Sequence, residues 1–194
     1  MTDAIVVILA GGEASRLPGK LERPVDGTPL LLQVYRNVRG RWPVYVSGRG
    51  SFSPDIDAEL DCPVIVDRWT RRGPLGGLMS VLTEVNAGRV FVAAGDAPRL
   101  TTEVFDRLAA AWRAGDEAVV PEHDGLLEPL AAFYDRAAVL REGAIVLSTR
   151  KPSMHALLER LRVRRVSLPA HWFLNINTAA DIAAMQRQEG HTNT

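Results

Sequence analysis

The amino-acid sequence predicts a three-layer α/β/α fold built on an open, mostly parallel β-sheet. Short runs rich in Val, Ile and Phe recur along the chain, and most are apolar on both faces, as in parallel strands buried on both sides. Segments with helical spacing separate these runs, and such alternation is typical of a doubly wound sheet. The expected strands are residues 5–10, 43–47, 62–66, 90–94 and 117–120, and the expected helices are residues 29–38, 74–86, 101–113, 153–162 and 178–187.

Residues near the ends of these segments support the assignment. Proline is favoured at the start of a helix and glycine just beyond its end, and the sequence places them so at Pro29, Pro74, Gly88 and Gly115. Thr178 followed by Asp181 resembles a capping box at the start of the last helix.

The alternation weakens after Glu122, where residues 130–134 are expected to form one more strand and residues 163–168 a short edge strand. No repeat, low-complexity segment or linker divides the chain. We therefore expect a single domain over residues 1–194, with the polar residues 186–194 as a frayed tail.

Composition excludes several classes of function. The 23 basic residues balance 23 acidic ones, so the basic excess typical of a nucleic-acid-binding protein is missing. The apolar run at residues 4–10 is too short to cross a bilayer. Cys62 is the only cysteine, which excludes an intrachain disulfide and a thiolate metal cage. We expect a cytoplasmic protein with neither nucleic-acid nor membrane partners.

The segment LAGGEASRLPGK, residues 9–20, follows the first strand, where open α/β sheets bind ligands. Gly11 and Gly12 let the backbone turn sharply and present N–H groups, while Arg16 and Lys20 add positive charge. The spacing fits neither the Walker loop nor the dinucleotide fingerprint. This segment therefore predicts a different kind of polyphosphate-binding loop.

Polar residues follow other expected strands at the same rim of the sheet. The buried run at residues 90–95 ends in Asp96, and Mg2+ is usually held by only one or two carboxylates together with phosphates and water. Asn175 and Asn177 are separated by one residue, so both amides face one side of an extended segment. These residues predict a metal site at Asp96 and a polar surface beside it.

The segment at residues 73–77, GPLGG, is expected to open a helix whose first-turn N–H groups attract anions or base carbonyl groups. Gly76 and Gly77 would serve helix–sheet packing equally well. Both interpretations stay open at this point.

Taken in order, several motifs resemble the family of molybdenum cofactor guanylyltransferases. They are LAGG at residues 9–12, the pair Arg16 and Leu17, Lys20, GPLGGL at 73–78, GDAPRL at 95–100, EPL at 128–130 and NINT at 175–178. The resemblance covers residues 5 to about 185. It implies a Rossmann-like nucleotidyltransferase fold, Mg2+ as cofactor, and transfer of GMP from GTP to the phosphate of molybdopterin. Molybdoenzymes or other cofactor-biosynthesis proteins would be partners.

The resemblance also implies roles for individual residues. Lys20, Arg16 and Asp96 would be catalytic, and Asn175 and Asn177 would face the acceptor and its phosphate. The nucleotide would contact Leu9, Ala10, Gly11, Gly12, Lys20, Ser47, Asp67, Gly73, Pro74, Leu75 and Asp96.

The sequence departs from the family pattern at three places. Only three residues separate Arg16 from Lys20, so Arg23 is an alternative to Lys20; we prefer Lys20 because Gly19 frees the backbone to aim it. Ser47 stands where the family often has asparagine, and residue 179 is alanine where the family has proline.

The expected chemistry is attack of the acceptor's phosphate on the α-phosphorus of GTP. A phosphate monoester has a second pKa of about 6, so no general base is needed. This agrees with four histidines that form no catalytic pattern. The alternatives are an enzyme that uses CTP or a sugar-phosphate acceptor, a catalytically inactive protein that binds or delivers the cofactor, and a nucleotide-binding regulator.

Overall fold

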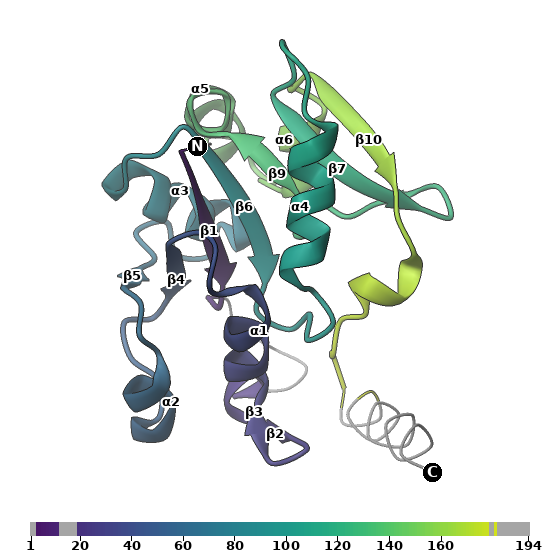
Figure 1. The fold of residues 1–194 in the computed structure, drawn as a ribbon. Helices are drawn as coiled ribbons and strands as arrows, with labels where there is room; N and C mark the ends of the chain where they lie inside the picture. Colours follow the sequence, from purple (N-terminus) through teal and green to yellow (C-terminus); the bar gives the residue numbers. More distant parts are fainter. Residues whose placement is uncertain (1–2, 12–18, 179–180, 182–194) are drawn as a thin grey trace.

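A β-sheet runs through the centre of the computed structural model, which describes residues 3–11, 19–178 and 181 (Figure 1). Its strands are β1 (Ala4–Leu9), β4 (Val44–Gly48), β5 (Val64–Val66), β6 (Arg89–Ala94), β7 (Ala118–His123), β8 (Leu126–Leu127), β9 (Phe133–Asp135) and β10 (Val163–Ser167). The order across the sheet is β10-β7-β9-β6-β1-β4-β5, with β8 paired to β7. A separate hairpin joins β2 (Pro24–Val25) and β3 (Thr28–Pro29).

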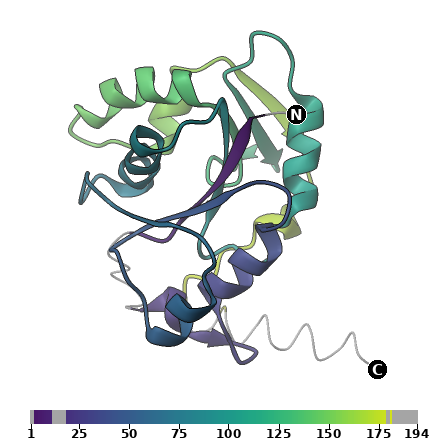
Figure 2. The ribbon, with the colours of Figure 1, turned by 60° about the vertical axis from the view of Figure 1, so that its left-hand side comes forward.

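Helices cover both faces of the sheet, as Figures 1 and 2 show from two directions. The α-helices are α1 (Leu30–Val38), α2 (Pro54–Glu59), α3 (Gly73–Glu84), α4 (Thr102–Ala111), α5 (Arg136–Leu147) and α6 (Met154–Leu158), and the 3-10 helices are η1 (Lys20–Glu22) and η2 (Ala170–Phe173). One apolar cluster packs α1, α2 and α4 against one face, and a second packs α3, α5 and α6 against the other. The predicted three-layer α/β/α fold is confirmed.

Strand β1 is buried on both sides, as its continuous apolar run predicts. Val6 and Ile8 belong to the cluster under α1 and α4, whereas Ile5 and Val7 belong to the cluster under α3 and α5. None of the four is more than 4% exposed. This burial makes β1 the centre of the fold, since apolar contact with both helical layers depends on it.

Parallel pairing aligns the ends of the central strands. β1 pairs in parallel with β4 on one side and with β6 on the other, which sets Leu9 level with Ser47 and Ala94. The residues that follow these three strands therefore emerge at one rim of the sheet.

Two strands make the sheet mixed rather than wholly parallel. β9 runs antiparallel to both β6 and β7, and β8 runs antiparallel to β7. The strand expected at 130–134 is thus found slightly later, in the opposite direction to its neighbours. Asp124 and Gly125 turn the chain between β7 and β8 with φ of 49° and 78°, angles that Asp-Gly pairs adopt in tight hairpins.

Helix α5 was not among the expected helices. Gly143 interrupts its sequence pattern, because glycine is a poor helix former. The structure shows why glycine is there, since an added Cβ would lie 2.8 Å from Met79 Sδ on α3. The start of α5 is capped by Asp135, whose carboxylate accepts a 2.8 Å hydrogen bond from the Ala138 N–H.

Other helix boundaries also differ. The short helix α2 was not expected, and α6 ends at Leu158 rather than at residue 162. Most of the helix expected at 178–187, and the tail at 186–194, lie outside the described residues. Thr178 and Asp181 do form the expected capping box: the Thr178 N–H donates to Asp181 Oδ2 at 2.7 Å, and the Asp181 N–H donates to Thr178 Oγ1 at 3.2 Å.

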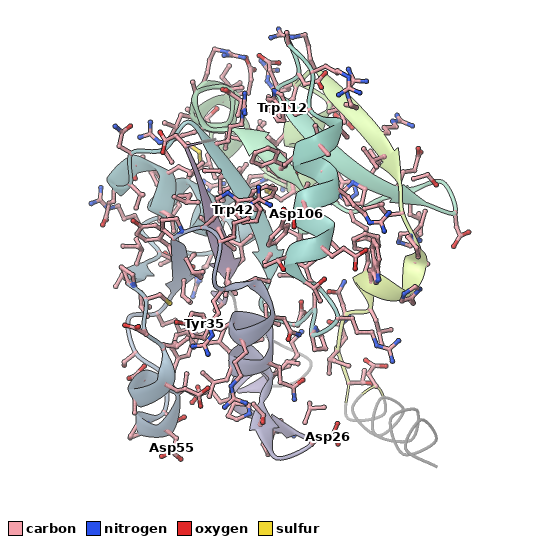
Figure 3. The ribbon with its side chains drawn as sticks, viewed as in Figure 1. Asp26, Tyr35, Trp42, Asp55, Asp106 and Trp112 are labelled. Carbon is pink, nitrogen blue, oxygen red and sulfur yellow. The ribbon has the colours of Figure 1, made fainter. Side chains whose placement is uncertain are left out.

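Aromatic rings fill the core between β6, β9 and α4. Phe91 stacks on Phe133 with ring centroids 3.9 Å apart and on Phe105 at 4.7 Å. Trp42 and Trp112 extend this cluster from either side, and both are labelled in Figure 3. Stacked aromatic pairs contribute beyond the area they bury, so this cluster ties α4 to the middle of the sheet.

Charged side chains on the edge strand β10 form ion pairs with residues in and next to β7. Arg164 pairs with Asp116 at 2.7 Å, and Arg165 pairs with Glu122 of β7 at 3.2 Å. The opposite edge is β5, which is only three residues long.

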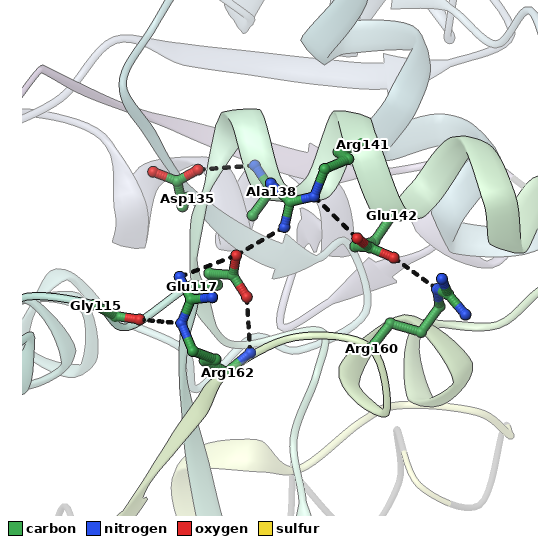
Figure 4. Close-up of polar contacts among 8 residues, drawn as sticks. All are labelled: Gly115, Glu117, Asp135, Ala138, Arg141, Glu142, Arg160 and Arg162. Carbon is green, nitrogen blue, oxygen red and sulfur yellow. Dashed lines mark hydrogen bonds and ion pairs between the residues drawn. The ribbon is translucent and has the colours of Figure 1, made fainter.

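A network of ion pairs and hydrogen bonds holds β7, β10 and α5 at the amino end of the sheet, opposite the rim where β1 ends (Figure 4). Glu117 Oε1 accepts from Arg141 Nη2 at 2.7 Å, and Glu117 Oε2 accepts from the Arg162 N–H at 2.9 Å. Burial alone would raise the pKa of Glu117, but these hydrogen bonds and positive charges bring that pKa below its ordinary value. The carboxylate form of Glu117 therefore stabilises the fold.

We expect Glu117→Gln to lower the free energy of unfolding by about 2 kcal/mol at neutral pH, because hydrogen bonds to a buried charge are lost. The lowered pKa means that this stabilisation is complete above the ordinary glutamate pKa and is lost as pH falls through the folded-state pKa. The difference between wild type and variant should therefore shrink in acid. Urea unfolding at neutral and acidic pH measures both effects.

Glu103→Gln is the matched control, because Glu103 forms only an exposed pair with Arg107 along α4. Its effect should stay below about 0.5 kcal/mol. Equal destabilisation by the two variants would contradict the role assigned to the Glu117 network.

Candidate functional site

Backbone hydrogen bonds join the loops that follow β1, β4 and β6. The Ala10 N–H donates to the Ser47 carbonyl at 2.8 Å, and the Gly95 N–H donates to the Leu9 carbonyl at 3.0 Å. The Ala10 N–H is therefore used within the sheet, so the backbone N–H groups that this loop can offer to a phosphate follow Ala10. The first residue beyond this point that the structure describes is Gly11.

An ion pair lies at the centre of the rim. Lys20 Nζ lies 2.5 Å from Asp96 Oδ2 and donates a hydrogen bond to Asn177 Oδ1 at 3.1 Å. The side chains of Lys20 and Asp96 are 12% and 22% exposed. The Ile176 N–H also donates to the Asp96 carbonyl at 2.9 Å, so the segment containing Asn177 is attached to the end of β6. Three distant parts of the sequence thus meet at one cation.

The position of Lys20 depends on the residue before it. Gly19 immediately precedes η1 and has a φ of 66°. This φ lies in the left-handed region, where glycine is favoured. Arg23, the alternative to Lys20, is exposed at the end of η1. Of these two cations, Lys20 is the one that the structure places against Asp96. Gly12 and Arg16 lie outside the described residues.

A second cluster lies beside the first, at the ends of β4 and β5. The Ser47 hydroxyl donates to Asp67 Oδ1, and Ser47 is fully buried. Burial raises the pKa of Asp67, although the hydrogen bond from Ser47 opposes this shift. An added Cβ at Gly11 would lie 2.0 Å from Asp67 Oδ2, and one at Gly77 would lie 2.4 Å from Ser47 Oγ. A Cβ at either position would force the Ser47 or Asp67 side chain to shift.

The start of α3 clarifies what residues 73–77 contribute. Gly73 has φ of 61° and Pro74 occupies the first turn, so the helix begins where expected. Proline has no N–H, and the Leu75 side chain is fully buried in the core. Pro74 therefore supplies no N–H donor and the Leu75 side chain packs in the core, and the nucleotide contacts expected from these two residues stay predictions.

Gly76 and Gly77 serve different purposes. An added Cβ at Gly76 would lie 2.6 Å from the Trp69 carbonyl, so Gly76 is needed for packing within the turn and helix. Gly77 faces Ser47 and Asp67 instead. Both glycines thus allow close packing of α3 against its neighbours, and the ligand-binding interpretation of this segment stays a prediction.

Asn175 and Asn177 follow the alternation expected of an extended segment. Between them, Ile176 is fully buried against Val25 and Leu30. Asn177 contacts Lys20, whereas Asn175 lines a cavity next to Asp96. The pair therefore borders two adjoining parts of the rim.

That cavity has a volume of about 310 Å3 and is mostly apolar. Ala94 and Ala97, on either side of Asp96 in the sequence, form one wall. Its polar side chains are Asn175, His155 and Glu128, and the apolar residues include Leu127, Leu130 and Phe173.

The sequence reasoning gave Glu128 no role and missed His123, which lies next to it. His123 Nε2 is 2.8 Å from Glu128 Oε1, and the His123 ring stacks on Phe173 at 5.5 Å. The hydrogen bond with Glu128 is the main reason why the pKa of His123 is raised. The turn pair Asp124-Gly125 was the available signal, because a hairpin there sets His123 and Glu128 on facing segments.

The oxygen atoms at the centre of the rim can hold a metal ion. Within residues 3–11, 19–178 and 181, no group of three or more His, Cys, Asp or Glu side chains forms a metal cage. Asp96 Oδ2 and Asn177 Oδ1 nevertheless converge on one cation, the ammonium of Lys20. One carboxylate with an amide suits Mg2+ when nucleotide phosphates supply further oxygens.

No helix in the described part of the chain combines the length and the apolar character that a membrane span requires.

Comparison with known proteins identifies the family. Residues 6–166 match the model of the MobA-like NTP transferase domain. A probable molybdenum cofactor guanylyltransferase of Mycobacterium marinum is 33% identical over 194 residues, covering 95% of this chain and 94% of that protein. One of the same name from Thermococcus gammatolerans is 31% identical over 199 residues, covering 94% and 99%.

Solved structures agree on the fold. Molybdopterin-guanine dinucleotide biosynthesis protein A from Archaeoglobus fulgidus superposes with a TM-score of 0.79 at 24% identity, over 96% of this chain and 98% of that one. A nucleotidyl transferase from Methanothermobacter thermautotroptrophicus gives 0.79 at 16% identity, over 98% and 99%. With the family model matching residues 6–166, this chain belongs to the MobA-like NTP transferase domain family and is a nucleotidyltransferase.

Proposed function

We propose that this enzyme transfers GMP from GTP to the phosphate of molybdopterin and releases pyrophosphate. The observation that carries the proposal is the contact of Lys20 with both Asp96 and Asn177. This contact lies between the Ser47–Asp67 cluster, which is suited to a nucleoside, and the cavity lined by Asn175 and Glu128, which is suited to an acceptor. The relatives from Mycobacterium marinum and Thermococcus gammatolerans, both named probable molybdenum cofactor guanylyltransferase, support this choice of substrates.

The nucleoside of GTP would lie beside Asp67. Guanine presents two adjacent N–H donors on one edge, and a fixed carboxylate accepts from such an edge, whereas the matching edge of cytosine presents mainly acceptors. Ser47 holds the Asp67 carboxylate in place. Gly11 and Gly77 leave the space that the Asp67 and Ser47 side chains themselves occupy, which keeps that carboxylate at the rim.

The triphosphate would lie over the loop that contains Lys20. Lys20 is a mobile point charge that can release Asp96 and pair with phosphate oxygens. The sequence places Arg16 in the same loop, as a further cation for the phosphates.

Asp96 and Asn177 would then hold Mg2+ together with those phosphates. When bound there, Mg2+ neutralises charge that develops on the phosphate oxygens during transfer. Asp96 orients the reacting groups from a rigid strand end, and Lys20 stabilises the same charge from the loop.

The reaction is a displacement at phosphorus. A phosphate oxygen of molybdopterin forms a bond to the α-phosphorus, and the bond from that phosphorus to the bridging oxygen breaks. Pyrophosphate leaves with the electron pair. Because the attacking monoester is largely ionised near neutral pH, with a second pKa of about 6, the chain needs to hold the two substrates in line but needs no residue to remove a proton.

Incubation with GTP, Mg2+ and molybdopterin should yield pyrophosphate and the guanine dinucleotide. Pyrophosphate release and chromatographic detection of the dinucleotide measure the two products separately. Tight GTP binding without pyrophosphate release would instead indicate a nucleotide-binding regulator, and cofactor binding without turnover would indicate a delivery protein.

Asp96→Asn should lower the rate of transfer by about 100- to 1,000-fold, the range for removing one preorganised electrostatic partner of a transition state. GTP binding measured without metal should change little, because the nucleoside contacts lie at Asp67. Asp55→Asn on α2 is the matched control, since Asp55 is exposed on a separate helix (Figure 3). Unchanged turnover in Asp96→Asn would contradict the proposed metal site.

Gly77→Ala should raise the KM for GTP by about tenfold, because the new methyl group displaces Ser47 and Asp67. Alanine favours the helix, which offsets part of the cost of this displacement in stability. Gly143→Ala on α5 is the matched control: it also adds a methyl group at a tight contact in a helix, against Met79 and away from the rim. Initial-rate kinetics and thermal unfolding of both variants separate the two effects. Equal KM values for the two variants would refute the nucleoside site.

A thermal-shift series with Mg2+ and each nucleoside triphosphate tests the choice of base. At a GTP concentration of 100 times the Kd, stabilisation of about 2.7 kcal/mol raises the Tm by about 5–10 °C for a chain of this size. CTP at the same concentration should raise the Tm by less. Selective stabilisation by CTP would favour the cytidylyltransferase alternative.

A further inference from the structure

The cavity lined by Glu128 lies on the opposite side of Asp96 from the Ser47–Asp67 cluster. In the sheet, β4 and β5 lie beyond β1, whereas β9 and β7 lie beyond β6. Ala94 and Ala97 in the cavity wall flank Asp96 in the sequence. A molecule whose phosphate reaches Asp96 from this side would therefore place its other end in the cavity.

The cavity wall suits a flat heterocyclic ring. Leu127, Leu130 and Phe173 provide apolar surface for the faces of a ring, and the volume of about 310 Å3 is at the small end of ligand sites. Among the lining residues that lie in the described part of the chain, Glu128 contributes the only carboxylate. A carboxylate in an apolar cavity favours a ligand edge that presents N–H donors.

The neighbours of Glu128 hold it in place. His123 binds Oε1 of the carboxylate, and the Glu128 N–H donates to the Pro121 carbonyl at 3.0 Å. His123 is itself packed against Phe173 and is only 15% exposed. The hydrogen bond that His123 donates to Glu128 raises the pKa of His123, which favours a positive partner for the carboxylate. Glu128 thus keeps its orientation within an apolar wall.

We propose that Glu128 is a specificity residue for the acceptor and that it accepts hydrogen bonds from the 2-amino group and the adjacent ring N–H of a pterin. This inference rests on the proposed function for the identity of the acceptor. His123 acts as a positioning residue that orients the carboxylate. The motif EPL at residues 128–130 then has a chemical role, with Pro129 and Leu130 shaping the turn and the wall.

The subsite is tested with unsubstituted pterin, which has the ring but no phosphate, and with lumazine, the same ring system with oxygen in place of the 2-amino group. Binding to the full-length protein is followed by ligand fluorescence. Wild type should bind the pterin about tenfold or more tightly than lumazine, because one donor to Glu128 is lost. Saturating GTP should not displace the pterin, because GTP occupies the other side of Asp96.

Glu128→Gln preserves the shape of the side chain and can still accept from His123. It should weaken pterin binding by about tenfold to a hundredfold and reduce the preference for pterin over lumazine. The affinity for GTP should not change. Glu103→Gln, the same substitution at an exposed pair on α4, should behave as wild type in all three measurements.

Hydrogen exchange on the wild type locates the ligand without any substitution. The pterin should protect backbone amides in residues 126–131 and leave those around Ser47 and Asp67 unchanged.

Failure of the wild type to bind pterin, displacement of pterin by GTP, protection around Asp67 alone, or an unchanged preference in Glu128→Gln would each overturn the inference. These outcomes differ from failure of the proposed function. If guanylyl transfer is absent but pterin still binds and is discriminated from lumazine, the subsite stands and the transfer reaction does not.

Discussion

Parallel pairing of β1 between β4 and β6 is the constraint on which the rest of the structure depends. It aligns Leu9 with Ser47 and Ala94, so the chain leaves three neighbouring strands at one level. Polar groups separated by tens of residues can meet there only because each strand is buried and fixed in register. The rigid sheet supplies the geometry, and the loops supply the chemical groups.

Acidic groups divide the rim into parts with different environments. Asp67 is held by the Ser47 hydroxyl, Asp96 by the Lys20 ammonium, and Glu128 by the His123 ring. These three carboxylates differ in their partners: a neutral hydroxyl, a mobile ammonium and a stacked imidazole. They therefore differ in net local charge and in freedom to move. In the function that we propose, one type of functional group would therefore serve base recognition, metal binding and acceptor recognition along a single edge.

The sequence predicts the layers and the central strands because β1 and β6 are continuous apolar runs with clear ends. It also predicts that Lys20 and Asp96 lie at one rim, since both follow such strands. Helix α5 could not be recognised, because Gly143 interrupts its helical pattern. The reason for glycine at this position is the close approach of Met79 on α3, which the sequence does not show. The pairing of His123 with Glu128 was missed because it depends on a hairpin and on Phe173, from a distant segment.

The two edge strands of the sheet, β10 and β5, affect whether the protein aggregates. An unpaired edge strand can recruit a strand from another molecule, which leads to aggregation. On β10, Arg164 and Arg165 are held in ion pairs with Asp116 and Glu122, so charge lines that edge. On the other side, β5 offers only three residues for pairing. The edges of the sheet are therefore poorly suited to pairing with a strand of a second molecule, although the rim at the ends of its strands is open to ligands.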